Sequence, residues 1–447
     1  MTLELFDEAD AARDRLAGRL AAGLNRLVDV DLLLKKLLIH ARSLVKAEAG
    51  TVYLVRRGRL VFAISQNDYL EKAVGIGQDL PFLGENLRID RGTLAGFVAI
   101  EQRPLTVNDT DRIDPDSPFQ HYKRLDHVNS YVCRAIATLP LKASGGETLG
   151  VLQLINPQTV SGLSTEFSPG GERALAFFAD SAALALEKAL MLRKTTLLTI
   201  RAVTASDPTE TAAHAQRVAR LSAEIYDHWA NGRKTPVVER ERVLNLLPVA
   251  AMMHDIGKCF ISREVLGKPG RLNLIERKAM EGHVAVGAAM FSIPRTYLDR
   301  LALNVILDHH ERWDGLGYPG RLGLSDYDAS GRAKGKKGEE ISIFGRILAV
   351  ADVYDALSSR RIYKEAFDES LAVQIMEQES GHHFDPEVIE SFMAVRQVLG
   401  KIRQRFPETG ANEDDEPSPG ELGQDYDWRD RGPTQPPDLE APAEDEP

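Results

Sequence analysis

Cysteine is almost absent from this sequence, which contains only Cys133 and Cys259 among 447 residues. Two such distant cysteines exclude a disulfide framework and are typical of a reducing compartment. The first residues, MTLELFDEADAARDRLAG, contain acidic side chains where a secretory signal would be basic and then apolar. From these two features we expect a cytoplasmic protein.

Long apolar runs and an excess of positive charge are also missing. The most apolar helical stretch, ALAFFADSAALALEKALML, is interrupted by Asp180, Glu187 and Lys188, so we expect no membrane span. Residues 407–447 contain fourteen acidic residues and two arginines, which gives this segment a net charge of −12. Because the whole chain has a net charge of −11, residues 1–406 have a net charge of +1. A nearly neutral body has no broad field to attract DNA or RNA, and we expect no nucleic-acid polymer as a partner.

The length and the changes of sequence pattern indicate several domains. Apolar residues at three- and four-residue spacing predict helix over 3–45, and short β-rich runs such as GTVYLV, RLVFAIS and TLGVLQLIN then predict an antiparallel sheet. The acidic, proline-rich end cannot bury enough apolar surface to fold, so we expect it to be disordered. The expected parts are an N-terminal helix (1–28), an α+β domain (29–190), a linking helix (171–204), an all-α domain (198–405) and a tail (406–447).

Large apolar residues recur every seven positions along the linking helix, at Phe177, Leu184, Met191 and Leu198. This spacing is typical of a coiled-coil seam and predicts a homodimer through the helix. The companion positions include Ser181, Lys188 and Thr195. Because these polar residues weaken the seam, a helix that packs on its own domain is the competing interpretation.

The α+β part resembles a GAF sensory domain, with flanking helices around its antiparallel sheet. The resemblance is carried by LLLKKLLIHARSLVKAEAGTVYLV, GTLAGFVAIEQRPLTVND and IATLPLKASGGETLGVLQLINP. It implies a small-molecule ligand for this domain in some members, and frequent dimerisation. The Asn-Lys-Phe-Asp-Glu set of cyclic-nucleotide-binding members is missing, so the ligand stays open. Cys133 could attach a chromophore, although a lone cysteine beside a strand is more often a small buried apolar residue.

Histidines and acidic residues gather at five points of the helical half. They are Glu210 with His214, His254 with Asp255 and Lys258, His283, His309 with His310, and Asp352 with Asp355. Each has an ordinary reading alone, as a satisfied core histidine, a helix cap or a surface lysine. Together they indicate a metal site, because acids within apolar helices need a counter-charge.

The spacing of these residues favours two metal ions. Adjacent helical residues point about 100° apart, so His254 with Asp255, or His309 with His310, are poorly placed to chelate one ion squarely. They suit a cluster in which the Asp255 carboxylate bridges two ions. The expected ligands are His214, His254, Asp255, His283, His309, His310 and Asp352. They leave roughly four open positions on two octahedral ions, as a catalytic site requires. A donor set without thiolates favours iron or manganese over zinc.

Residues 198–405 resemble an HD-GYP domain, a subgroup of the HD metal-dependent phosphohydrolases. The matching motifs are HDIGK, HHERWDGLGYP, RILAVADVYDALSSRRIYK and GHHFDP. The resemblance implies an all-α HD-type phosphohydrolase that cleaves cyclic di-GMP to linear pGpG or GMP.

The catalytic residues are expected to be Asp255 and Lys258, with Lys258 contacting the scissile phosphate and stabilising or protonating the leaving oxygen. Glu311 is expected to orient a ligand histidine. By resemblance, Glu210 would hold a third metal ion, unless it lies on a helix surface. The substrate-binding residues implied in the same way are Tyr318, Asp355, Arg361 and Lys364, with a partner surface as the alternative for Tyr318.

The chain departs from the HD-GYP pattern at three places. Ser342 and Ile362 replace residues that are usually proline, and Gly320–Lys337 stands where a few residues are usual. This insertion is either a surface excursion or a flap near the anionic substrate. Two functions compete with cyclic di-GMP hydrolysis: hydrolysis of another cyclic dinucleotide or nucleotide phosphate, and a catalytically silent module that binds signalling partners.

Overall fold

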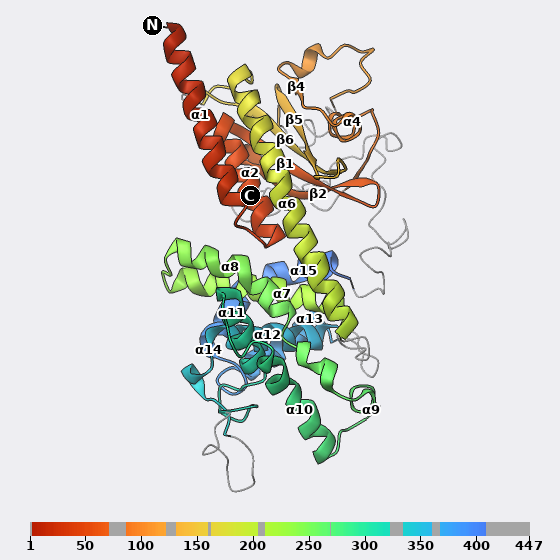
Figure 1. Ribbon diagram of the computed structural model, residues 1–447, viewed down its shortest axis with the longest axis vertical. Coiled ribbons are helices and arrows are strands. Elements are labelled where there is room, and N and C mark those ends of the chain that lie inside the picture. The colour runs from red at the N-terminus through yellow and green to blue at the C-terminus, as the bar shows by residue number, and fades with distance from the viewer. Residues whose placement is uncertain are drawn as a thin grey trace, which may run out of the picture. The chain divides into compact units, whose positions relative to one another are not determined.

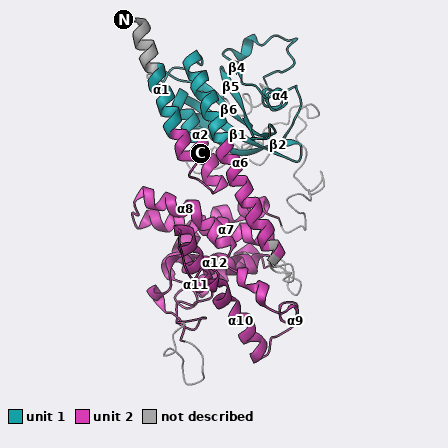
Figure 2. Cartoon of the chain, in the orientation of Figure 1, with its two compact units in different colours: residues 1–19, 38–183, 412–447 teal, residues 20–37, 184–411 magenta. Residues whose placement is uncertain are grey.

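The structure is a computed structural model of the 447-residue chain (Figure 1). It describes residues 2–70, 86–121, 131–159, 162–203, 211–268, 270–321, 334–359 and 367–407. Three expected site residues (Glu210, Arg361 and Lys364) and the tail from residue 408 lie outside these ranges. The chain divides into two compact units (Figure 2), residues 1–19, 38–183 and 412–447 in the first and residues 20–37 and 184–411 in the second.

The first part of the chain contains helices and the strands of one sheet. The elements are α1 (Thr2–Leu24), α2 (Val30–Val45), β1 (Ala47–Arg56), β2 (Arg59–Asn67), β3 (Asn86–Arg88), α4 (Leu94–Glu101), β4 (Leu105–Val107), η1 (Thr110–Arg112), β5 (Ile136–Lys142), β6 (Thr148–Pro157) and α6 (Pro169–Val203). The strand order is β3-β2-β1-β6-β5-β4, and every neighbouring pair is antiparallel. This confirms the expected α+β fold with an antiparallel sheet and flanking helices.

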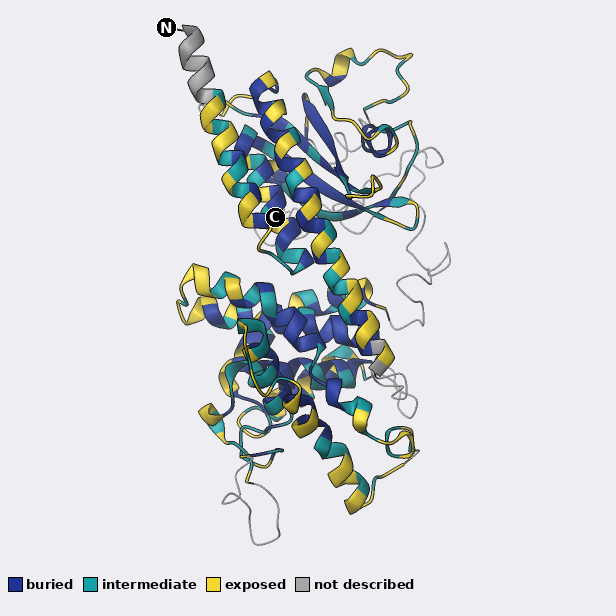
Figure 3. Cartoon of the chain, in the orientation of Figure 1, coloured by how far each residue is buried: buried dark blue, intermediate teal, exposed yellow. Residues whose placement is uncertain are grey.

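The second unit is helical throughout its described residues after α6. Its elements are α7 (Ala212–Gly232), α8 (Val237–Met252), η2 (Ile256–Phe260), α9 (Arg263–Leu266), α10 (Leu274–Ala289), α11 (Tyr297–Asp308), η3 (Gly338–Glu340), α12 (Ile343–Ser358), α13 (Glu369–Gln378), α14 (Pro386–Ala394), η4 (Arg396–Val398) and α15 (Leu399–Arg405). The buried core lies where α7, α8, α11 and α12 pack on one another (Figure 3). The all-α expectation for this half is confirmed.

The expected helix over residues 3–45 is instead two helices, with a break between α1 and α2. Asn245 of α8 holds the break: its Oδ1 accepts hydrogen bonds from Val28 N at 2.7 Å and Asp29 N at 3.1 Å. Asp29 then caps α2, because its Oδ1 accepts from Leu32 N at 2.8 Å. The apolar period continues across the break, which is why the pattern alone predicted one helix. Among the described residues, no helix combines the length and apolarity that crossing a bilayer requires.

Candidate metal centre

Five helical elements of the second unit supply the candidate ligands. His214 lies in the first turn of α7, and His254 and Asp255 lie directly after α8 ends at Met252. His283 lies within α10, His309 and His310 follow α11, and Asp352 lies within α12. The η2 segment that follows Asp255 is a 3-10 helix, so His254 and Lys258 do not share a continuous α-helix as the four-residue spacing suggested.

The structure brings all seven described ligand candidates together in two groups. Donor atoms of Asp255, His283, His309 and His310 lie within 4.8 Å of one another, and those of His214, His254 and Asp352 form the second such group. The first and last of these residues, His214 and Asp352, are 138 positions apart in the sequence. Their convergence is therefore a property of the tertiary fold.

Asp255 lies between the two groups. Its Oδ1 is 2.9 Å from Nε2 of His283 and 3.5 Å from Nε2 of His309. Its Oδ2 is 3.2 Å from Nε2 of His254 and 2.8 Å from Nζ of Lys258. Burial raises the pKa of Asp255, but Lys258 and His254 outweigh burial and hold the pKa well below its usual value. The carboxylate thus directs one oxygen toward each of the two groups of donor atoms.

A glycine allows this approach. A Cβ at position 257 would lie 1.9 Å from the carbonyl oxygen of His283, closer than any side chain permits. Only glycine lets the backbone after Asp255 touch α10 in this way. Gly257 therefore brings the His254–Asp255 pair against His283.

The imidazole rings are held by backbone carbonyls. Nδ1 of His254, His283 and His309 lies 2.8, 2.6 and 2.9 Å from the carbonyl oxygens of Ala251, Met280 and Ile306, respectively. A carbonyl only accepts, so each Nδ1 carries the proton and each Nε2 presents a lone pair. Burial lowers the pKa of His309 and His310, which keeps both rings neutral. Neutral rings with fixed Nε2 positions are the form in which histidine binds metals.

The donor atoms fit a bound cation. Nε2 of His283, Nε2 of His309 and Oδ1 of Asp255 are buried and make no hydrogen bond within the part of the chain that the structure describes. Such buried polar atoms are costly unless another group satisfies them. A divalent ion bound by these nitrogen and carboxylate donors would satisfy all three atoms at once.

Adjacent histidines lie in one group, unlike the expectation from helix geometry. His309 and His310 both face Asp255, and their ring centroids are 4.0 Å apart. The helix ends at Asp308, so His310 is placed by the turn that follows. The 100° rotation per residue of a helix therefore does not govern this pair.

Asp355 was expected to contact the nucleotide. In the structure its carboxylate is buried and binds two side chains of α7. Its Oδ2 accepts a hydrogen bond from Nδ1 of His214 at 2.8 Å, and Arg217 donates to Oδ1 at 2.6 Å. Burial raises the pKa of Asp355, but these bonds lower it below its ordinary value. The carboxylate is buried and fixes the ring of His214, so that Nε2 of His214 faces Asp352 at 3.5 Å.

Glu311 also differs from its expected contact with a ligand histidine. Its two oxygens accept hydrogen bonds from Gly320 N at 2.6 Å and Lys336 N at 3.0 Å. Burial raises the pKa of Glu311 to about 7, although these two N–H groups oppose the shift. The side chain thus holds the two ends of the Gly320–Lys337 insertion together.

Tyr318 packs on a candidate ligand. Its ring stacks on His310 with centroids 4.7 Å apart, and its backbone N–H donates to the His310 carbonyl at 3.1 Å. The following peptide bond to Pro319 is cis. The aromatic side chain therefore covers one side of the His309–His310 pair.

Two functional residues were missed by sequence reasoning. Arg217 neutralises Asp355, and its Nη1 also donates to the Phe406 carbonyl at 2.9 Å. Asp308 is buried directly before the histidine pair and bonds to Lys336. The only signal for Arg217 in the sequence was its position one helical turn after His214. Nothing in the sequence indicated the partner of Asp308.

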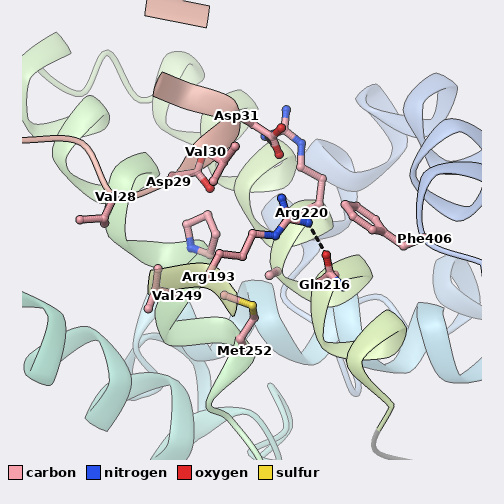
Figure 4. A pocket seen from close by; sticks show the side chains of 12 residues that line it. Val28, Asp29, Val30, Asp31, Arg193, Gln216, Arg220, Val249, Met252 and Phe406 are labelled. Carbon is pink, nitrogen blue, oxygen red and sulfur yellow. Dashed lines mark hydrogen bonds and ion pairs between the residues drawn. The ribbon is translucent and has the colours of Figure 1, made fainter. Parts of the chain in front are cut away.

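A second polar cluster lies around the N-terminus of α2, in a pocket of the second unit (Figure 4). Asp31 pairs with Arg405 and Arg220, and Arg193 of α6 donates to Gln216 of α7. Burial and the neighbouring Asp31 charge raise the pKa of Asp29 to about 6. Because Gln216 and Arg220 share α7 with His214, this cluster is connected to the metal centre through one helix.

Comparisons with known proteins agree with this organisation. Residues 29–186 match the GAF domain model, and residues 205–326 and 323–388 match the HD domain model. A cyclic di-GMP phosphodiesterase of Vibrio cholerae is 35% identical over 219 residues, which cover 48% of this chain and 42% of that protein. A cyclic di-GMP phosphodiesterase of Thermotoga maritima is 34% identical over 216 residues, 47% of this chain and 53% of that protein.

A relative that is named for another substrate is similar to the same extent. The 3'3'-cGAMP-specific phosphodiesterase 2 of Vibrio cholerae is 35% identical over 200 residues, which cover 44% of this chain and 34% of that protein. The chain thus spans about half or less of the length of these curated relatives.

Proposed function

We propose that this chain, which combines a GAF domain with an HD domain of the HD-GYP type, hydrolyses cyclic di-GMP to linear pGpG, GMP or both. The observation that carries the proposal is the position of Asp255, with one carboxylate oxygen toward each group of donors. A carboxylate between two groups of histidines could hold two ions side by side, as two-metal phosphodiester hydrolysis requires. The names of the relatives support the choice of substrate. Because that substrate is an intracellular signal, we place the reaction in the cytoplasm.

Two divalent ions, iron or manganese, would be held by the two donor groups. One would take Asp255, His283, His309 and His310, and the other His214, His254, Asp352 and the second oxygen of Asp255. When bound, such ions supply an activated water and neutralise charge on the phosphodiester. A third ion at Glu210 stays a proposal, and loss of one metal equivalent in Glu210→Ala, by metal analysis of purified protein, is its test.

Lys258 is the candidate residue for protonating or stabilising the leaving oxygen. Its ammonium is largely buried beside Asp255 and is the charged donor nearest the bridging carboxylate among the described residues. In the reaction, an oxygen from water forms a bond to phosphorus, the bond to the ribose 3′ oxygen breaks, and that oxygen takes a proton. A lysine ammonium can donate this proton or stabilise the negative charge that develops.

Substrate recognition is assigned to residues around the metal centre. Tyr318 is positioned on His310 and offers an aromatic surface near the donors. Arg361 and Lys364 keep their proposed contact with the nucleotide by resemblance, since arginine suits bidentate binding of phosphate or of a guanine edge. Asp355 is reassigned to the orientation of His214.

The strongest competing substrate is 3'3'-cGAMP, because the name of one relative gives it as that protein's substrate. The two substrates share the diester linkage and differ in one base. Purified protein loaded with Fe(II) or Mn(II) should be given cyclic di-GMP, 3'3'-cGAMP and cyclic di-AMP in parallel, with products separated by chromatography. We expect the highest kcat/KM for cyclic di-GMP. A higher value for another dinucleotide would replace it as the substrate, and no hydrolysis by metal-loaded protein would favour the silent signalling module.

Regulation by the GAF domain and dimerisation through α6 complete the proposal. Phe177, Leu184, Met191 and Leu198 are 54%, 52%, 71% and 50% exposed. Four large apolar side chains exposed at seven-residue spacing support the coiled-coil interpretation over packing on the chain's own domain. The GAF ligand stays open, and the burial of Cys133 argues against an attached chromophore.

A further inference from the structure

The described ends of the Gly320–Lys337 insertion lie against the turn that carries His309 and His310. We propose that Lys336 is a positioning residue for this histidine pair, acting through Asp308. The inference rests on the proposed function only in that the pair binds metal. It concerns a residue in a segment that stands where the HD-GYP pattern usually has only a few residues.

The first observation is the environment of Asp308. Asp308 is 3% exposed, and Lys336 Nζ donates a hydrogen bond to its Oδ1. The other oxygen accepts from Ser342 N at 2.7 Å. Proline, the usual residue at position 342, has no N–H to donate. Both partners of Asp308 therefore come from features in which this chain departs from the usual pattern.

The second observation is the environment of Glu311, on the other side of the histidine pair. Its carboxylate accepts from the backbone N–H groups of Gly320 and Lys336, one at each end of the insertion. Lys336 thus contacts the residue before the pair with its side chain and the residue after the pair with its backbone. The pair is held from both sides by one residue.

The third observation is the close packing beside Lys336. A Cβ at Gly335 would lie 2.4 Å from the carbonyl oxygen of Gly315, so the two backbones touch. The base of the insertion is therefore built against the turn after the histidines, and the reading of a loose surface excursion does not apply to its described ends. Nothing in these contacts brings Lys336 to a donor atom of the metal groups, so it acts by position.

Loss of the lysine should weaken metal binding. Without Lys336 Nζ, a buried carboxylate next to His309 would lose its counter-charge, and the turn would rearrange to hydrate it. Rearrangement moves the Nε2 atoms of His309 and His310 relative to Oδ1 of Asp255. Residues that orient metal ligands typically change metal affinity by about 10–100-fold when mutated.

The test compares Lys336→Met with Lys334→Met in the full chain. Lys334 is exposed, and its side chain makes no hydrogen bond or ion pair with the described residues, so it is a matched control. Metal-free proteins are titrated with Mn(II) or Fe(II) against a competing chelator, and bound metal per chain is measured. We expect roughly tenfold or greater loss of affinity at one of the bound ions for Lys336→Met, and wild-type affinity for Lys334→Met.

A second variant separates positioning from folding. Asp308→Asn added to Lys336→Met removes the unpaired charge, since removing both partners costs less than removing one. We expect this double variant to recover most of the metal affinity, and every metal-free protein to stay folded at the titration temperature, with a lower thermal midpoint for Lys336→Met alone. Equal affinity in Lys336→Met and wild type would overturn the inference. So would a loss of affinity that Asp308→Asn does not repair.

The readout also distinguishes this inference from the proposed function. Metal affinity is measured without substrate. If wild type binds metal but cleaves no dinucleotide, the proposed function fails while the Lys336 effect still stands. If wild type cleaves cyclic di-GMP and Lys336→Met binds metal normally, only the inference fails.

Discussion

Asp255 shows how single residues define the chemistry of this site. Its buried carboxylate meets a lysine on one oxygen and two imidazoles on the other. Lys258 contacts Oδ2 and not Oδ1, and burial lowers the pKa of His309 beside Oδ1, so this oxygen has a deficit of positive charge. A metal ion at Oδ1 would remove this deficit.

Lys258→Met is predicted to lower kcat while the bound metal stays near its wild-type amount. The lysine would act on the leaving oxygen, and loss of a positioned proton donor typically costs about 10²–10⁴ in rate. Lys278→Met, at an exposed position of α10, is the control. Steady-state kinetics with metal analysis make the measurement, and a kcat within about twofold of wild type would remove Lys258 from the mechanism.

Sequence reasoning identified donors better than it identified what holds them. His214, His254 and Asp352 could be selected because their residue types suit metal binding, and the structure brings them together in one donor group. The partners could not be selected in the same way. Arg217 meets Asp355 across 138 positions, a pairing that depends on how two helices pack. Ion pairs between distant residues leave no periodic signal in a single sequence.

At the scale of elements, α2 shows a helix end determined from outside its own sequence. The carboxamide of Asn245 binds the backbone at Val28 and Asp29 and separates α2 from α1. Apolar periodicity reports which face of a helix is buried, and it does not report where a side chain from another helix interrupts the chain. The sheet was easier to predict because each strand carries its own apolar pattern.

Asp29→Asn is predicted to stabilise the protein near pH 7. Burial and Asp31 raise the pKa of Asp29 from 3.8 to about 6. A raised folded-state pKa means that Asp29 contributes stability at low pH, which is lost as pH rises from about 4 to about 6. Asparagine stays neutral and can still accept from Leu32 N. The thermal midpoint of the variant should exceed that of wild type at pH 7, and the difference should shrink as pH approaches 4.

The stability that Asp31 contributes is expected to depend on pH in the opposite direction to that of Asp29. Arg405 and Arg220 hold the pKa of Asp31 below its usual value despite burial, so its contribution is present at neutral pH and lost on acidification. Asp31→Asn should therefore lower the midpoint at pH 7. If both variants shift the midpoint in the same direction at pH 7, the assignment of charges in this cluster is wrong.

At the scale of the whole molecule, the exposed residues of α6 bear on the assembly. In a dimer, glutamates at Leu184 and Met191 would place negative charges from both helices in the apolar seam. We therefore predict that this double variant is a monomer. Thr199→Glu, exposed on the same helix outside the seven-residue series, is the control. Light scattering after size-exclusion chromatography measures the mass. A monomeric wild type, or a double variant that stays dimeric, would refute the seam.

The central claim is that two cations on either side of Asp255 act together on a phosphodiester. The most direct measurement is a titration of metal-free protein with Mn(II) or Fe(II), in which cyclic di-GMP hydrolysis and bound metal per chain are followed in the same samples. The account predicts little activity at one equivalent and a steep rise as the second ion binds. Full activity with a single bound ion, or no hydrolysis when both donor groups are filled, would contradict it.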